Sequence, residues 1–284
     1  MRLAVSSWSF HRPLYAGTLH LADVPLAVFE LGLRQVELND RFLTSPQPGR
    51  VARLLGAKPA QTSAPDYGRK ALRRVQQARL RSGTRVVCWT IDTDLVVSSA
   101  KAQQTQRAYL ATAIEAARFL GAPILRLTLG GLAGERAALG RAIDLLRNAL
   151  PVALASGVRL AIENHGGLSS EAGVLAEVIA AFPWTRDRVA RPIGVCLDLG
   201  HFPEGEHIAG VTRLAPLAIH VHAPAQAFDE HGAETSIDYE LSLKTLRAAG
   251  YEAAISIEYG GDDDPRTGIL KTKALIEKYW VAQD

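Results

Sequence analysis

The sequence predicts a single (β/α)8 TIM barrel, and three observations support this fold class. Short apolar runs alternate with longer helical stretches along all 284 residues. Strands that alternate with helices form a parallel sheet, because parallel neighbours need a crossover connection. No G-x-G-x-x-G follows a strand and no linker or low-complexity tract divides the chain. We therefore expect one barrel domain over residues 1–284 rather than an open dinucleotide-binding sheet or two domains.

Eight apolar runs are the candidate strands. A ninth short run at 57–61 is either a strand or a loop, which leaves the count open by one. The eight runs are, in chain order, residues 3–8, 35–39, 85–92, 124–130, 158–164, 193–199, 217–222 and 254–259.

The helical stretches between these runs carry recognisable ends. The stretch 99–120 places an apolar side chain every three or four residues on one face and stops at Gly121. The stretches 139–155 and 241–249 likewise stop just before a glycine. Each apolar run is therefore separated from the next by a helix long enough to cross over the sheet.

Composition excludes several classes of protein. The chain is 48% hydrophobic and 21% charged, whereas disordered chains combine few apolar residues with a large net charge. No apolar run approaches the ~20 residues of a membrane span. The first segment turns polar at Ser6 and Ser7, too early for a signal peptide. We expect a cytoplasmic protein with no membrane association.

Charge and cysteine usage also limit the function. The net charge of +3 is small, and the densest basic stretch, 69–85, reads as the exposed face of a helix rather than a phosphate track. Cys88 and Cys196 fall inside apolar runs, where buried structural thiols are the ordinary interpretation. Neither a nucleic-acid partner nor a disulfide or zinc scaffold is expected.

Side-chain parity predicts which strand residues face the barrel lumen, because alternate residues of a strand point to opposite sides. In the seventh run, Ile219 and Val221 belong under helices, which turns His220 and His222 inward. His220 lies one layer deeper and is expected to pack behind the site. The same parity turns inward the last such residues of runs five, six and eight: Glu163, Asp198 and Glu258.

These inward residues predict a metal site. Glu163, Asp198, His222 and Glu258 stand at the ends of four successive strands, on the barrel face where active sites are built. Three carboxylates in a narrow lumen repel one another and need a cation. Three oxygen donors and one imidazole suit Mn²⁺, Mg²⁺, Co²⁺ or Zn²⁺. Four ligand-type residues at equivalent positions favour this reading over unrelated polar residues.

The same segments carry a family resemblance. The motifs IENHGG (162–167), LDLGH (197–201), HVH (220–222) and SIEYGG (256–261), in this order, resemble the sugar phosphate isomerase/epimerase superfamily with its xylose isomerase-like TIM barrel. Weaker similarity extends over nearly the whole chain. The superfamily includes ketose 3-epimerases, inosose and 3-dehydroshikimate dehydratases and, more distantly, endonuclease IV-type nucleases.

The resemblance implies roles for individual residues. It makes the four inward residues the metal ligands and makes Glu163 and Glu258 the groups that exchange the substrate proton. It also implies that His201, which follows Asp198 at the matching spacing, bonds the substrate oxygen near the reacting carbon. The expected function is a divalent-metal-dependent isomerase or epimerase acting on a sugar, keto-sugar or related polyol through a metal-stabilised enediolate.

Five further residues are candidate substrate contacts. Trp8 reads equally as a sugar-stacking platform and as a barrel plug, and Arg126 as a substrate anchor or a salt bridge to a carboxylate. Glu37 reads as a substrate contact or a hydrogen-bonded structural residue. Asn164 is placed for hydrogen bonding to hydroxyl groups, and His165 follows it in the loop after the fifth strand.

The sequence departs from the ketose 3-epimerases at one position. They have an arginine six residues beyond the metal histidine, where this chain has Phe228. No Lys/Arg pair or glycine-rich loop offers a phosphate site, so a non-phosphorylated small-molecule carbohydrate is the expected partner. Homo-oligomerisation is left open.

Three rival functions differ in their support. A metal-dependent dehydratase or lyase is the main alternative, since elimination starts from the same enediolate. The endonuclease-type nuclease needs further histidines that strands two to four do not supply. A non-catalytic barrel would have no reason to keep unpaired carboxylates in its lumen.

Overall fold

The computed structural model describes residues 2–44, 65–183 and 191–280 as a closed barrel of eight parallel strands. Each strand pairs with the next and β8 pairs with β1, which confirms the predicted (β/α)8 fold. The ninth run at 57–61 lies outside the described residues. The strands are β1 (Arg2–Ser6), β2 (Gln35–Asn39), β3 (Arg85–Thr90), β4 (Ile124–Leu127), β5 (Arg159–Glu163), β6 (Ile193–Asp198), β7 (Ala218–Ala225) and β8 (Ala254–Tyr259).

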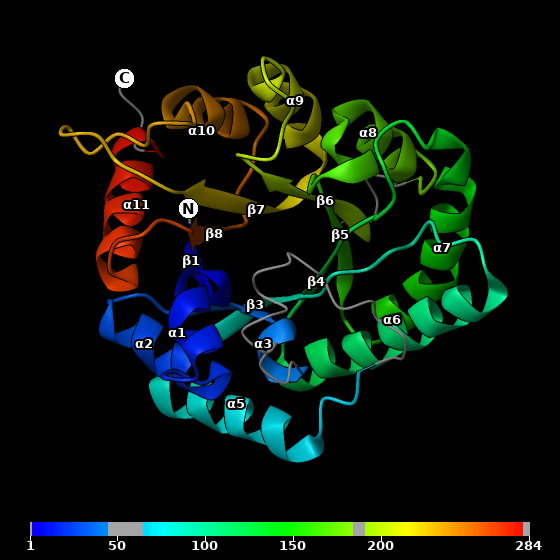
Figure 1. Ribbon diagram of the computed structural model, residues 1–284, viewed down its shortest axis with the longest axis horizontal. Helices are drawn as coiled ribbons and strands as arrows, with labels where there is room; N and C mark the ends of the chain where they lie inside the picture. The colour runs from blue at the N-terminus through cyan, green and yellow to red at the C-terminus, as the bar shows by residue number, and fades with distance from the viewer. Residues whose placement is uncertain (1, 45–64, 184–190, 281–284) are drawn as a thin grey trace.

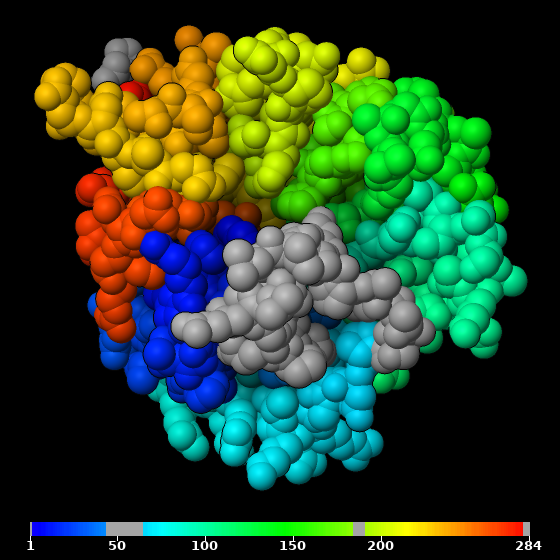
Figure 2. Space-filling view, in the orientation of Figure 1, coloured from blue at the N-terminus to red at the C-terminus, as the bar shows by residue number. Residues whose placement is uncertain are grey.

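Helices surround the ring of strands (Figure 1). In the space-filling view the blue N-terminal segment lies against the orange-red C-terminal segment, as the pairing of β1 with β8 requires (Figure 2). The helices are α1 (His11–Ala16), α2 (Val24–Glu30), α3 (Arg41–Thr44), α5 (Arg69–Ser82), α6 (Ala100–Leu120), α7 (Leu139–Ala155), α8 (Ala172–Ala180), α9 (His207–Leu214), α10 (Tyr239–Ala248) and α11 (Pro265–Trp280). Short 3₁₀ turns are η1 (Ser7–Phe10), η2 (Leu21–Asp23), η3 (Arg136–Ala138), η4 (Gly167–Ser170) and η5 (Ala215–Leu217).

The helix ends follow local chemistry. The hydroxyl of Ser99 accepts a hydrogen bond from the Ala102 amide at the start of α6, and Gly121 ends the helix with a φ of 74°. Helix α7 has the predicted bounds. Helix α10 begins two residues before the predicted start, because the Asp238 side chain accepts from the Leu241 amide and caps the helix.

Only β2 and β8 have the predicted bounds, and the other six strands differ in length; the causes are clearest for β1 and β7. Strand β1 ends at Ser6, because the Ser6 hydroxyl accepts from the Trp8 amide and starts η1. Strand β7 runs three residues past His222, because its pairing with β8 continues to Ala225 and Tyr259. The longer β7 carries the chain beyond the ligand positions before it turns away.

The apolar core has an outer part, between strands and helices, and a small part in the lumen. The prediction that Ile219 faces a helix is wrong. The register of β6 against β7 shifts between Val195 and Cys196, which turns Ile219 into the lumen. A Cβ added to Gly194 would come within 2.6 Å of its side chain, so this position tolerates no larger residue without a shift. The lumen cluster consists of Cys88, Ile124, Ala161, Cys196 and Ile219.

The remaining composition-based expectations concern the surface and the thiols. In the basic helix α5 only Val75 and Ser82 are buried, as expected for a solvated face. Cys88 and Cys196 are buried free thiols. Among residues 2–44, 65–183 and 191–280, no helix combines the length and apolar character that crossing a bilayer requires.

Buried Asp40, just after β2, predicts a pH-dependent stability. Burial raises its pKa from 3.8 to about 6, although the hydroxyls of Tyr109 and Tyr67 donate to it at 2.6 and 2.9 Å. The folded protein thus keeps a proton that the unfolded chain releases, and this carboxyl makes stability fall as pH rises from about 4 to 6. Asp40→Asn removes this pH dependence. The unfolding free energy of the variant minus that of wild type should therefore increase by about 2 to 3 kcal/mol from pH 4 to pH 7. Urea unfolding of both proteins at pH 4 and pH 7 measures this increase. A stability difference that is the same at both pH values would contradict the prediction.

Candidate metal centre

The four predicted ligands converge at the carboxyl ends of β5, β6, β7 and β8. One donor atom from each of Glu163, Asp198, His222 and Glu258 lies within 4.8 Å of all the others. The first three side chains are buried, and that of Glu258 is 14% exposed. The cluster is therefore closed on three sides and accessible at Glu258.

The orientation of the donor atoms fits a cation. Nδ1 of His222 lies 3.5 Å from Oε2 of Glu258 and 3.9 Å from Oδ2 of Asp198, and it also contacts Oε1 of Glu163. None of these contacts has hydrogen-bond geometry, and Nδ1 of His222 and Oδ2 of Asp198 are buried without a hydrogen-bond partner in the described chain. Buried polar atoms normally have such a partner. Donor atoms that converge in this way suit a divalent ion, which these four residues would hold.

Glu37 holds the opposite side of the His222 ring. Its fully buried carboxylate lies 2.9 Å from Nε2 of His222 and 2.6 Å from Nε2 of His220, and it accepts a third bond from the Thr90 hydroxyl. A carboxylate only accepts, so Nε2 of His222 carries a proton and Nδ1 is the ring nitrogen that would bind an ion. Burial would lower the pKa of His222, but Cys196 and the surrounding glutamates raise it well above its usual value, so a bound ion would displace a proton from Nδ1. Burial would raise the pKa of Glu37, but the two histidines hold it well below its usual value. Glu37 is thus hydrogen-bonded to three side chains, and the substrate contact considered for it stays a prediction.

Glu37→Gln should weaken Mn²⁺ binding by about 10- to 100-fold. The amide would present both a donor and an acceptor to two imidazole N–H groups and would no longer compensate the charge of a bound cation. Isothermal titration with Mn²⁺ measures the change. Glu115→Gln, on an exposed position of α6, is the matched control, and an affinity within twofold of wild type for Glu37→Gln would contradict the role.

Asn164 joins the end of β5 to the end of β6. Its fully buried amide donates to the Asp198 carbonyl at 2.8 Å and accepts from the Asp198 amide at 2.8 Å. Asp198 in turn accepts at Oδ1 from the amides of Gly200 and His201, at 2.7 and 3.0 Å. These bonds leave Oδ2 of Asp198 directed at the cluster. The substrate contact predicted for Asn164 stays a prediction.

Two loop histidines lie together beside the ligands. The rings of His165 and His201 have centroids 4.6 Å apart. Burial lowers the pKa of His165 to about 4. For His201 burial also lowers the pKa, but Nδ1 lies 3.1 Å from Oδ1 of Asp198, and this carboxylate raises the pKa to about 9. The pair therefore offers one neutral and one cationic imidazole at the rim.

Arg126 is engaged with carboxylates, the second of the two roles considered for it. Its guanidinium, on β4, binds Oε2 of Glu163 through Nη2, and Nη1 lies 2.7 Å from Oδ1 of Asp92 and 3.1 Å from the Ile91 carbonyl. Burial would raise the pKa of Glu163, but Arg126 is the main cause that lowers it. Burial raises the pKa of Glu258 to about 7 despite the opposing charge of His222. The two glutamates thus stand in different environments.

Trp8 lies in an aromatic group on η1, just after β1. Its half-buried ring stacks on His11, with centroids 4.8 Å apart, and the guanidinium of Arg41 lies 5.3 Å from the ring. Phe42 lies 6.3 Å away. Both roles considered for Trp8 remain predictions.

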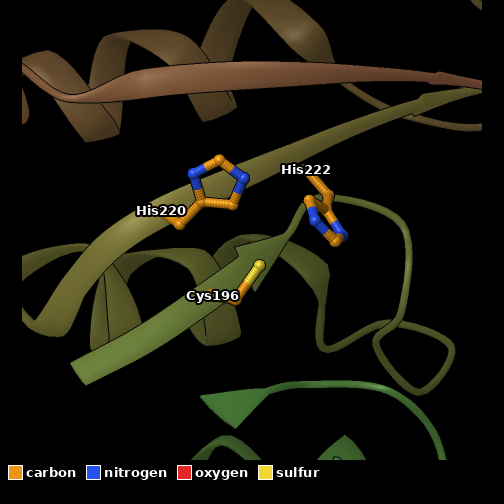
Figure 3. Close-up of side chains that lie close together, drawn as sticks. All are labelled: Cys196, His220 and His222. Carbon is orange, nitrogen blue, oxygen red and sulfur yellow. The ribbon is translucent and has the colours of Figure 1, made fainter. Parts of the chain in front are cut away.

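Sequence reasoning did not connect the cysteines with the histidines. Cys196 on β6 and His220 and His222 on β7 point toward one another (Figure 3). Cys88 lies within the same reach of Glu37 and His220. Cys196 pairs with His220, and Glu37 with Cys88, directly after a register shift in each strand pair, and the sequence carries no signal for these shifts. Sequence reasoning also missed Asp92, the second partner of Arg126.

Comparisons with known proteins identify the family of the chain and structures with a similar fold. The sequence model of the family described as xylose isomerase-like TIM barrel matches residues 27–279. No curated protein matches the chain.

Solved structures resemble the chain over nearly its full length at low identity, which establishes the fold. The D-psicose 3-epimerase of Clostridium cellulolyticum H10, with D-tagatose, is 11% identical with a TM-score of 0.70 over 99% of both chains. The probable 3-DHS dehydratase AsbF of Bacillus anthracis is 12% identical with a TM-score of 0.68, over 97% of this chain and 98% of that one. The IOLI protein with a bound zinc atom is 13% identical with a TM-score of 0.69, over 99% of this chain and 100% of that one.

Proposed function

The chain belongs to the xylose isomerase-like TIM barrel family, and from that premise we propose that it is a divalent-metal-dependent sugar isomerase or epimerase. Its substrate would be a non-phosphorylated keto-sugar or related polyol. The reaction would transfer a proton at the carbon next to a carbonyl. Sugar epimerases among the similar structures support this substrate class.

One observation carries the proposal: the unpaired, buried donor atoms of His222 and Asp198 face two further carboxylates across a space of metal-site size. Mn²⁺, Mg²⁺, Co²⁺ and Zn²⁺ all suit this donor set, and a zinc atom is bound in one similar barrel. Held by Glu163, Asp198, His222 and Glu258, such an ion would supply Lewis-acid stabilisation of the negative charge that develops on the substrate oxygens.

The residues of the chain would divide the remaining work. Glu258, the exposed member of the cluster, would take the proton from the substrate carbon. His201, cationic at the rim, would donate a hydrogen bond to the substrate oxygen beside that carbon. Trp8 and His165 would contact the sugar face and hydroxyls. Glu37 and Asn164 would hold the ligands from behind, through His222 and Asp198.

A dehydratase is the second candidate, and position 228 favours it. Phe228 stacks on Tyr259, with ring centroids 6.3 Å apart, so the loop after β7 places an apolar ring where the resembling ketose 3-epimerases have an arginine. A probable dehydratase is among the similar structures. Loss of a β-hydroxyl would follow the same first proton abstraction.

Metal analysis followed by NMR in D₂O tests the proposal. The purified protein should contain or take up one divalent ion. With a panel of keto-sugars and cyclic keto-polyols it should then place solvent deuterium on the carbon next to the carbonyl. A dehydrated enone product would transfer the assignment to a lyase. If the protein took up no metal and exchanged no deuterium into any compound, both candidates would be refuted.

A further inference from the structure

We propose that Arg126 restricts proton transfer at this centre to a single carboxylate, Glu258, by occupying the outer oxygen of Glu163. The proposal rests on the proposed function and specifies its stereochemistry. A reaction that inverts a carbon with two glutamates needs a base on each face of the substrate, and each glutamate must have one oxygen for the metal and one for the carbon. The two glutamates here do not meet this requirement equally.

Both oxygens of Glu163 are engaged. Oε1 faces Nδ1 of His222 within the ligand cluster, and Oε2 binds Nη2 of Arg126. The side chain is only 1% exposed. No oxygen of Glu163 is therefore left to receive a proton from a substrate carbon.

Glu258 differs in contacts and in access. Oε2 faces Nδ1 of His222 at 3.5 Å, and its side chain is 14% exposed. In the described ranges, 2–44, 65–183 and 191–280, no hydrogen bond reaches Oε1 of Glu258, and Oε1 takes part in no ion pair. This oxygen remains available at the open side of the cluster.

The position of Arg126 is fixed from several sides. Its side chain is 5% exposed, and Nη1 binds both Oδ1 of Asp92 and the Ile91 carbonyl. Arg41 binds the other oxygen of Asp92, so this carboxylate is itself held. A buried arginine with three such partners cannot leave Glu163 without unpairing charges in the lumen, a strongly unfavourable change.

A single base selects a class of reaction. Glu258 would remove the proton from the carbon next to the carbonyl, the C–H electron pair would become the C=C bond of an enediolate, and the π pair of the carbonyl would move onto its oxygen. In an isomerisation the same carboxyl returns the proton to the former carbonyl carbon, on the same face, while a proton moves between the two oxygens. In an elimination the electron pair instead expels a β-hydroxyl group, which leaves as water with the proton of Glu258. Inversion of one carbon is not expected.

The stereochemical course of the wild-type reaction tests this directly. The Mn²⁺-loaded protein, incubated in D₂O with D-fructose, D-tagatose and a cyclic keto-polyol, should exchange deuterium into the substrate with retained configuration, or form a carbonyl-shifted isomer or a dehydrated product, and should form no epimer. Solvent deuterium in an inverted carbon as the main product would overturn the proposal while leaving the proposed function standing.

Metal affinity tests the contact without a substrate. Arg126→Met frees Oε2 of Glu163 and removes a cation that competes for it, so Mn²⁺ should bind about tenfold more tightly, about 1.4 kcal/mol. Arg126→Lys, which keeps the charge, should bind within about threefold of wild type, and Arg118→Met on an exposed position of α6 should be unchanged. Circular dichroism checks that each variant folds. If Arg126→Met does not fold, the stereochemical course of the wild-type reaction remains the test of the proposal.

The outcomes separate the two proposals. Unchanged or weaker Mn²⁺ binding by folded Arg126→Met would show that Arg126 does not compete with the ion for Oε2 of Glu163 and would overturn the proposal. No Mn²⁺ binding by the wild-type protein, with no exchange in any compound, would instead remove the proposed function and this inference with it.

Discussion

Replacing Glu258 with glutamine is expected to lower substrate proton exchange by about 10²- to 10⁴-fold, the range of a lost general base. Glu258 is the one cluster glutamate that is both partly exposed and free of a guanidinium partner. Burial raises its pKa to about 7, and a bound Mn²⁺ would lower this pKa, so that the carboxylate would be ionised and able to accept a proton near neutral pH. Glutamine keeps the shape and one oxygen but cannot carry that proton.

The measurement is the rate of deuterium incorporation by NMR, with each protein saturated with Mn²⁺. Saturation matters because Glu258 is also a candidate ligand, and a lower metal affinity alone could mimic a lost base. Glu252→Gln, at an exposed position shortly before β8, is the matched control and should exchange at the wild-type rate. Turnover by Glu258→Gln near that rate would remove Glu258 from the mechanism.

Asp198→Asn is expected to weaken Mn²⁺ binding by at least about 100-fold, more than the loss of a residue behind a ligand. The amide oxygen can still accept from the amides of Gly200 and His201, as Oδ1 does. The variant loses the position of Oδ2, which is buried without a hydrogen-bond partner. It also loses the charge that pairs with Nδ1 of His201, so the metal-free variant should unfold at a lower temperature than metal-free wild type.

Thermal unfolding with and without Mn²⁺ measures both effects. At a free ion concentration 100 times the wild-type dissociation constant, binding adds about 2.7 kcal/mol to wild-type stability. That corresponds to a rise in Tm of roughly 5 to 10 °C for a protein of this size. The variant should rise by only about 1 °C. Asp144→Asn on exposed α7 is the control, and an equal metal-induced rise in the Asp198 variant would argue against ligation.

The convergence of the four candidate ligands could be predicted because it depends on local rules. Side chains alternate along a strand, so apolar residues such as Leu160 and Ile162 that pack under helices determine which of their neighbours turn inward. Parallel strands bring their carboxyl ends to one face of the barrel. The rule failed at Ile219, where an irregular pairing of β6 with β7 adds a residue to one strand. Register irregularities depend on how two strands fit together, and neither strand's own sequence records them.

The sequence alone determined the barrel, the face that carries the site and the identity of the residues at its four strand ends, because periodicity and strand-end position are properties of single segments. The tertiary structure decided which side chains act on those residues. Glu37 meets His222 across the lumen from β2 to β7, and Arg126 on β4 takes one oxygen of Glu163. Such contacts join residues 185 and 37 positions apart in the chain. They depend on barrel closure and rotamers, which no local pattern encodes, and they distinguish two glutamates that look equivalent in the sequence.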